Sequence, residues 1–118
     1  MVPQLEDTIR AAHRMGVKIA TGADNYYEAG SINRISVEAA NLVRLGMTPF
    51  EALKAATVVS AELLDLGDRT GRIAEGFEAD LVLVPADPLE DISALQDVLL
   101  VMSNGQVALR RIPFAASE

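Results

Sequence analysis

The chain has no cysteine and few basic residues. Without cysteine, neither a disulfide nor a thiolate metal site can form. Ten lysines and arginines stand against 17 acidic residues, which gives a net charge of −7 and an isoelectric point near 4.6. A nucleic-acid backbone would be repelled by this charge, so we expect no nucleic-acid partner.

Long hydrophobic runs and basic segments are also missing. The longest apolar runs fall well short of the roughly 18 residues that a membrane-spanning helix needs. The start, Met1–Asp7, is polar and acidic, and it lacks the basic and apolar regions of a signal peptide. No basic run would hold an anionic membrane surface. We therefore expect a cytoplasmic protein without a membrane partner.

Apolar residues, in contrast, are abundant for so short a chain. They make up 50% of the 118 residues, and the mean hydropathy is +0.22. A chain of this length is one domain's worth of sequence and buries roughly two-thirds of its unfolded surface. We expect part of the apolar surface to be covered by a partner or by a further part of the same protein.

The first segment reads as a helix, a short strand and a loop. Pro3 suits the first helical turn, and Gly16 can form the left-handed cap that ends the helix. One apolar face is predicted from the i, i+4, i+7 spacing of Leu5, Ile9 and Ala12. Residues 17–21 then predict a strand, and 22–30 a loop at its carboxyl end.

Two further helices are predicted. The first would begin near Asn33, a good N-cap residue, and end at Gly46. Its buried face would be formed by Ile35, Ala39, Leu42 and Val43. The second begins with a capping box between Thr48 and Glu51. Its apolar residues are Phe50, Leu53 and Ala56, with a further turn or two over 60–66.

The remainder favours β-structure. Gly71 and Gly76 would bracket a short strand or hairpin, and Asn104-Gly105 is a strong two-residue hairpin signal. Three strands are predicted at Ala79–Val84, Val98–Met102 and Gln106–Leu109. The first of them is continuously apolar, so we expect cover on both faces.

The predicted elements divide the chain into three parts. Residues 1–66 form an αβαα part, residues 67–112 a β-rich part and residues 113–118 a tail.

Several separated motifs resemble the metal-dependent amidohydrolases, in the order and spacing of that family. Gly71–Gly76 matches its Gly-x-Ile-x-x-Gly hairpin, Ala79–Val82 its Ala-Asp-Leu-Val strand, and Asp87–Leu89 its Asp-Pro-Leu turn. Ile19–Asp24 is similar to the last barrel strand with its metal-binding aspartate, and Leu42–Thr57 to the following helices. The resemblance covers about residues 5–109 and is greatest to the prolidase-like and imidazolonepropionase-like branch.

The resemblance implies an α/β fold and a hydrolytic activity. The chain would be the C-terminal part of a (β/α)8 TIM barrel, with its last strand and helices, plus strands of an appended composite β-sheet. One or two divalent metals, zinc above all, would lie at the barrel mouth and activate a water that attacks a C–N bond of the peptide or N-acyl type. Asp24 would be a metal ligand and the proton shuttle to the leaving group.

The sequence departs from the family pattern around this aspartate. Ala23 replaces a threonine that usually precedes it, and Thr57–Ser60 lacks an asparagine often found there. The His-x-His pair, the bridging residue and two further histidines expected on earlier strands are missing. A catalytic zinc takes about three protein ligands, so we expect the chain alone to bind metal weakly at best and to hold no cofactor.

Other candidate site residues have less specific readings. Tyr26 and Tyr27 follow Asp24, and they could line the substrate pocket or pack the loop. Asn33 and Arg34 could also reach the pocket, although a charge on an exposed helix is the simpler reading of Arg34. His13, on the first helix and away from the barrel mouth, is read as a structural residue.

The acidic and glycine residues of the second half give no binding motif. Asp80, Asp87, Glu90 and Asp91 lack the alternating pattern and central glycine of a calcium loop, and they are read as solvated turn residues. No lysine–serine pair follows Gly71 and Gly76, so these are hairpin glycines and not a phosphate loop.

Three functions remain open. The chain could be a C-terminal amidohydrolase fragment that is inactive alone, a free-standing binding or structural module, or one half of a split hydrolase completed by a separate chain. The first predicts a homo-oligomer, because the unpaired edges of a lone strand at 17–21 invite pairing with another copy. The others predict, respectively, a stable monomer with a closed core and co-purification with a histidine-bearing partner.

Overall fold

The computed structural model describes residues 3–24 and 34–112, so the tail at 113–118 and most of the loop at 22–30 lie outside the described residues. The elements are, in chain order, α1 (Pro3–Arg14), α2 (Ile35–Arg44), α3 (Pro49–Ala56), α4 (Val58–Leu63), β1 (Leu81–Leu83), the 3-10 helix η2 (Ile92–Gln96), β2 (Leu100–Ser103) and β3 (Gln106–Arg110).

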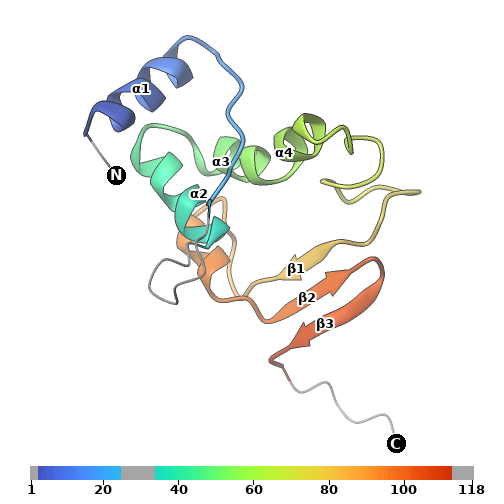
Figure 1. The fold of residues 1–118 in the computed structure, drawn as a ribbon. Coiled ribbons are helices and arrows are strands. Elements are labelled where there is room, and N and C mark those ends of the chain that lie inside the picture. Colours follow the sequence, from blue (N-terminus) through green and yellow to red (C-terminus); the bar gives the residue numbers. More distant parts are fainter. Residues whose placement is uncertain (1–2, 25–33, 113–118) are drawn as a thin grey trace, which may run out of the picture.

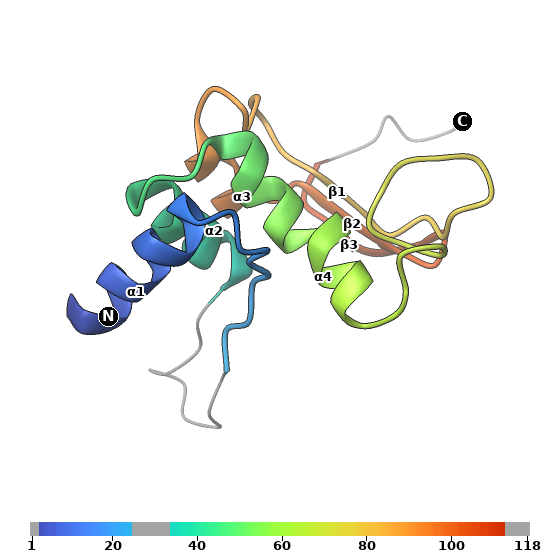
Figure 2. The same cartoon turned by 90° about the horizontal axis from the view of Figure 1, so that it is seen from above.

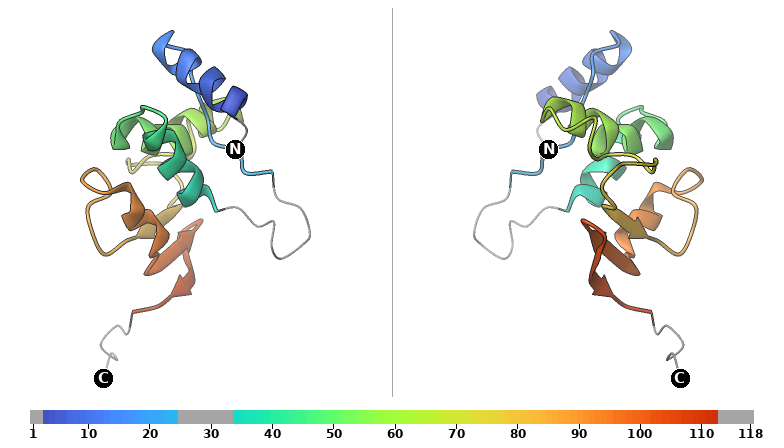
Figure 3. Two further views of the ribbon diagram at one scale, coloured as in Figure 1. Left: turned by 90° about the vertical axis from the view of Figure 1, so that its left-hand side faces the viewer. Right: turned by 90° about the vertical axis from the view of Figure 1, so that its right-hand side faces the viewer.

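The elements form successive layers along the molecule. Helix α1 lies at one end, α2 to α4 form the middle, and the three strands lie at the other end (Figures 1 and 3). The view from above shows α1 and the strands on opposite sides of α3 and α4 (Figure 2). Helix α2 packs against both α3 and η2. No described helix has the length and apolar character to cross a bilayer.

The helix boundaries follow mostly from local signals. Helix α1 begins at Pro3, as predicted, and Gly16 takes a positive φ of 76° just after its end. The capping box is confirmed: Thr48 Oγ1 accepts from the Glu51 amide at 3.2 Å, and a Glu51 carboxylate oxygen accepts from the Thr48 amide at 2.8 Å. The last helix is shorter than expected, because α4 ends at Leu63.

Helix α2 begins near Asn33, as predicted, with Ile35 as its first residue. Its N-cap residue is Arg34, and no side chain caps it; Asn33 lies outside the described residues. The predicted inner face of this helix is confirmed at Ala39 and Leu42, but Ile35 is 42% exposed. The first turn of α2 therefore projects beyond the core that its second and third turns help to form.

The core sits where α2, α3 and η2 meet. It consists of Ala39, Leu42, Met47, Ala52, Ala55 and Ile92. Half of these residues are alanines, and the described residues contain no large side chain that is fully buried. Phe50, predicted on the apolar side of α3, is instead 59% exposed, with the Lys54 Nζ 5.5 Å from its ring centre. The core is therefore thin, and small side chains bring the helices close together.

The predicted strand at 17–21 is wrong in this structure. Residues 17–24 adopt no regular secondary structure, and the described sheet contains β1, β2 and β3 alone. The Thr21 amide donates instead to the Ala55 carbonyl at the end of α3, at 3.2 Å. A strand is defined by its ladder partners, and the described part of the chain offers this segment none.

The sheet is an antiparallel meander in the order β1-β2-β3. The predicted Asn104-Gly105 hairpin joins β2 to β3, and a bulge lies between Val101 and Met102. The prediction of cover on both faces of the first strand was wrong, because Val82 is 56% and Leu83 45% exposed. The apolar side chains of this strand are therefore not covered by other described residues.

The predicted strand or hairpin between Gly71 and Gly76 was also wrong, since this stretch forms turns and bends.

Exposed apolar surface is a general property of this structure. Large apolar side chains are 40% or more exposed on the helices, on the loops and on the two outer strands, β1 and β3. The expected surplus of apolar surface is thus present.

Candidate functional site

Asp24 lies at the end of the segment that runs from α1 toward α2. Its side chain is exposed, and its backbone takes a left-handed φ of 43°. Two residues earlier, the Gly22 amide donates to Glu38 Oε1 of α2 at 2.9 Å. The segment carrying Asp24 is therefore attached to the helical layer through backbone amides. Tyr26 and Tyr27 lie outside the described residues, and their predicted role stays a prediction.

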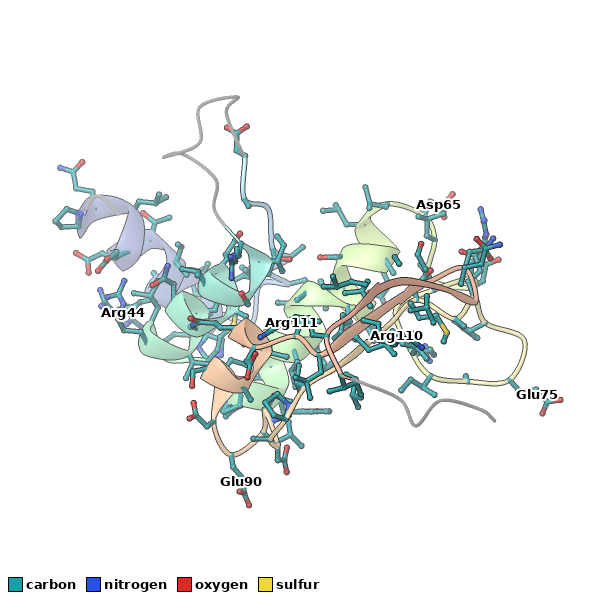
Figure 4. All side chains as sticks on the ribbon, turned by 90° about the horizontal axis from the view of Figure 1, so that it is seen from below. Arg44, Asp65, Glu75, Glu90, Arg110 and Arg111 are labelled. Carbon is teal, nitrogen blue, oxygen red and sulfur yellow. The ribbon has the colours of Figure 1, made fainter. Side chains whose placement is uncertain are left out.

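The described residues do not by themselves fit a complete metal site. Across 3–24 and 34–112 there is no group of three or more histidine or acidic side chains placed to hold an ion. The labelled carboxylates Asp65, Glu75 and Glu90 lie far apart in the molecule (Figure 4). A catalytic zinc takes about three protein ligands, so within these ranges Asp24 can offer one ligand of an incomplete set.

His13 joins α1 to α3, and this contact accounts for its position. Its Nε2 lies 3.2 Å from Glu51 Oε2, the same oxygen that accepts from the Thr48 amide. The Thr48 amide bond, with a further contribution from His13, lowers the pKa of the Glu51 carboxyl. The imidazole thus contacts the capping box of α3, as its structural reading predicts.

Arg44 makes the second polar link between α1 and the body. Its Nη2 lies 2.9 Å from Glu6 Oε1, and Figure 4 shows Arg44 beside α1. The hydrogen bond from Arg44 lowers the pKa of the Glu6 carboxyl. Helix α1 has no buried residue, so these charged contacts and the packing of Ile9 on the core hold it in place.

A large apolar groove lies between the helices and the sheet, and no sequence motif predicts it directly. Its volume is about 1080 Å³, and one wall is formed by the β-strand side chains Val82, Val101 and Leu109. The opposite wall includes Ile35, Leu53 and Leu95. Arg34, a candidate from the sequence, is among the residues that line this groove. The exposed valine and leucines on the strands are the feature from which such a groove could have been anticipated.

Asp80, Asp87 and Asp91 each accept a backbone amide. Asp87 Oδ1 accepts from Leu89 at 2.9 Å and Asp91 Oδ1 from Ser93 at 2.9 Å. These are turn and cap bonds, in agreement with the turn reading of the acidic cluster.

Asp80 has a larger structural role than the sequence suggested. It accepts from the Asn104 amide at 2.8 Å and from the Thr70 hydroxyl at 2.7 Å, and these bonds lower its pKa. A neighbouring ion pair, Arg69–Glu78, closes the same loop. Asp80 of the Ala-Asp-Leu-Val motif therefore ties the turn of the β2–β3 hairpin to the loop before β1.

Comparison with known proteins identifies the family. Residues 2–108 match the model of the family described as "Amidohydrolase family". A solved Xaa-Pro dipeptidase with bound methionine in its active site superposes with a TM-score of 0.80 and 37% identity, over 89% of this chain and 25% of that one. Ochratoxinase of Aspergillus niger is 38% identical over 91 residues, which are 75% of this chain and 18% of the relative. Imidazolonepropionase of Thermoplasma volcanium is 35% identical over 68 residues, or 55% of this chain and 17% of the relative.

The chain thus spans about a fifth of ochratoxinase and a quarter of the Xaa-Pro dipeptidase. Its fold is a small α/β arrangement of helices and an antiparallel sheet that corresponds to part of those larger structures. With a match from residue 2 to residue 108, the chain belongs to the amidohydrolase family.

Proposed function

We propose that these 118 residues act as the C-terminal part of a metal-dependent amidohydrolase that hydrolyses amide or peptide-type C–N bonds. In the complete fold they would supply the last strand of a (β/α)8 barrel at 17–21 with Asp24 after it, the helices that follow and strands of an appended sheet. The observation that carries this proposal is the superposition on a quarter of a Xaa-Pro dipeptidase at a TM-score of 0.80. Three-quarters of such a fold would come from polypeptide outside these residues.

Asp24 has the central role in this proposal. It follows a segment without regular secondary structure, and its side chain is exposed. In the complete enzyme it would contribute one metal ligand and carry a proton to the leaving group. Because the described residues do not complete a metal site, we assign no hydrolytic step to the chain alone.

The exposed apolar surface also supports the proposal that further polypeptide packs against this chain. Val82, Leu83 and Leu109 are each more than 40% exposed on the sheet. Apolar patches of this extent mark surfaces that contact other polypeptide. The complement would be either the remainder of the same chain or, in a split enzyme, a separate chain that carries the histidine ligands.

A hybrid enzyme tests the proposal. The matched quarter of the Xaa-Pro dipeptidase would be replaced by this chain, and hydrolysis of a Xaa-Pro dipeptide would be measured with metal content. We expect an active hybrid in which Asp24→Asn lowers kcat by roughly 10²- to 10⁴-fold, the range for a general acid–base group.

Asp65→Asn is the matched control. Asp65 also has a left-handed backbone, with a φ of 59°, and it is exposed in the turn after α4. It should leave the hybrid's activity unchanged. Full activity of the Asp24→Asn hybrid would contradict the proposal, and a stable monomer with a closed core would favour the binding or structural module.

A further inference from the structure

The segment 17–24 depends on a few identifiable contacts. The Val17 amide donates back to Ala12 in α1, and the Thr21 and Gly22 amides donate to the rest of the described body. Thr21 donates to a helix carbonyl at 3.2 Å, whereas Gly22 donates to a carboxylate at 2.9 Å. Hydrogen bonds to ionised acceptors are roughly twice as strong as neutral ones. The hydrogen bond from the Gly22 amide to Glu38 is therefore the stronger of the two, and it is also the one nearer to Asp24 in the chain.

Glu38 is well placed to act as a fixed anchor. It lies in the first turn of α2, where a carboxylate is favoured by the helix dipole. The next residue, Ala39, is 0% exposed in the core cluster. The α2 backbone at this position is therefore held by the core, and the Glu38 side chain, itself half-buried, extends from it to Gly22.

The hydrogen bond at Gly22 affects Asp24 because the two residues are close in the chain. Asp24 takes a φ of 43°, a region that non-glycine residues adopt only when the surroundings favour it. One residue, Ala23, separates it from the anchored amide. The position and direction of the backbone at Gly22 therefore largely determine the position of the Asp24 carboxylate.

We propose that Glu38 is a positioning residue: by accepting the Gly22 amide, it holds the backbone conformation in which Asp24 is presented. The inference rests on the proposed function for its significance, because it concerns the residue that would bind metal. It assigns Glu38 no contact with substrate or metal. Glu38, Gly22 and Asp24 all belong to this chain, so the effect of Glu38 on the backbone can be measured without the rest of an enzyme.

Nuclear magnetic resonance of the 118-residue chain gives the test. Glu38→Gln keeps an oxygen acceptor, and Glu38→Met keeps the length and helix propensity without one. In Glu38→Met we expect exchange of the Gly22 amide to rise about ten- to hundredfold, the factor for a lost bond to a charged acceptor. The Asp24 Cα and Cβ shifts and its HN–Hα coupling should leave their left-handed values. Glu38→Gln should keep both signals close to wild type.

A second glutamate supplies the control. Glu62 accepts from Lys18 Nζ at 3.0 Å on the same segment, so Glu62→Met should leave the Gly22 and Asp24 signals unchanged. The inference is overturned if Asp24 in Glu38→Met matches wild type, or if Glu38→Gln perturbs Asp24 as strongly. Loss of the α2 signals in Glu38→Met would also overturn it, because Glu38 would then stabilise the helix and not the segment.

The hybrid enzyme separates this inference from the proposed function. There Glu38→Met should lower kcat with little change in KM, and Glu38→Gln should restore it. If Asp24→Asn leaves activity intact, the proposed function fails whatever the backbone signals show. If Asp24 is essential but Glu38→Met changes neither kcat nor the Asp24 signals, the positioning role alone fails.

Discussion

Replacing Gly71 by alanine should strongly destabilise the chain. Gly71 has a positive φ of 97°, and a Cβ there would lie 2.9 Å from the Ala61 Cβ and 3.1 Å from the Thr57 carbonyl oxygen. The backbone conformation costs a non-glycine residue about 1–2 kcal/mol. Overpacking against a helix costs about 1–3 kcal/mol more. We expect the free energy of unfolding to fall by about 2–5 kcal/mol.

Gly76 offers a control that separates the two costs. Its φ is 84°, but nothing lies within 4 Å of the Cβ position. Gly76→Ala should therefore show the backbone cost alone, about 1–2 kcal/mol. Urea unfolding followed by circular dichroism at 222 nm would measure both variants. The difference between them isolates the contact between the loop and α4.

A double-mutant cycle identifies the clash directly. Ala61→Gly removes the methyl group nearest to Gly71 and costs about 1 kcal/mol by itself in helix propensity. If the methyl contact is the cause, Gly71→Ala should cost less in the Ala61→Gly background. Equal losses for Gly71→Ala and Gly76→Ala, or strict additivity with Ala61→Gly, would refute the reasoning.

Three further predictions concern a cap, a hairpin and the assembly state. Thr48→Ala should lower the free energy of unfolding by about 0.5–2 kcal/mol, as loss of a capping side chain does, measured by urea unfolding. Asp80→Asn should destabilise the chain at neutral pH but not at low pH, as urea unfolding at both would show. The Asn104 amide and the Thr70 hydroxyl lower the pKa of the Asp80 carboxyl in the folded chain. Its contribution to the free energy of unfolding is therefore present above about pH 4 and is lost as the pH falls further. Light scattering should give a mass of at least twice 12.6 kDa, since the apolar surface is open; a compact monomer would contradict this.

Features encoded by neighbouring residues could be predicted from the sequence. The capping box needs Thr48 and Glu51 three residues apart, and the hairpin needs Asn104-Gly105 between apolar runs. Both form as expected, because their hydrogen bonds close within the same few residues. The same holds for the end of α1 at Gly16.

Features that depend on distant partners could not be predicted in the same way. The pattern at 17–21 is that of a buried strand, but a ladder requires a neighbour that the described residues lack. The apolar run at 79–84 indicated burial for a similar reason. The hydrogen bond from Gly22 to Glu38 spans 16 residues and has no pattern in sequence. Asp24 could be proposed from its motif, whereas the group that holds its backbone required the structure.

The alanine-rich core has a consequence for how stability changes with temperature. A buried methyl group removes little apolar surface from water, and it is apolar exposure that gives unfolding its positive heat capacity. Ala39, Ala52 and Ala55 are almost completely inaccessible, yet together they hide less surface than leucines would. The heat capacity of unfolding should thus fall below the value typical of this length, and the stability curve should be unusually flat. The free energy of unfolding of such a chain changes little on cooling, so additional contacts would raise it more than a change of temperature would.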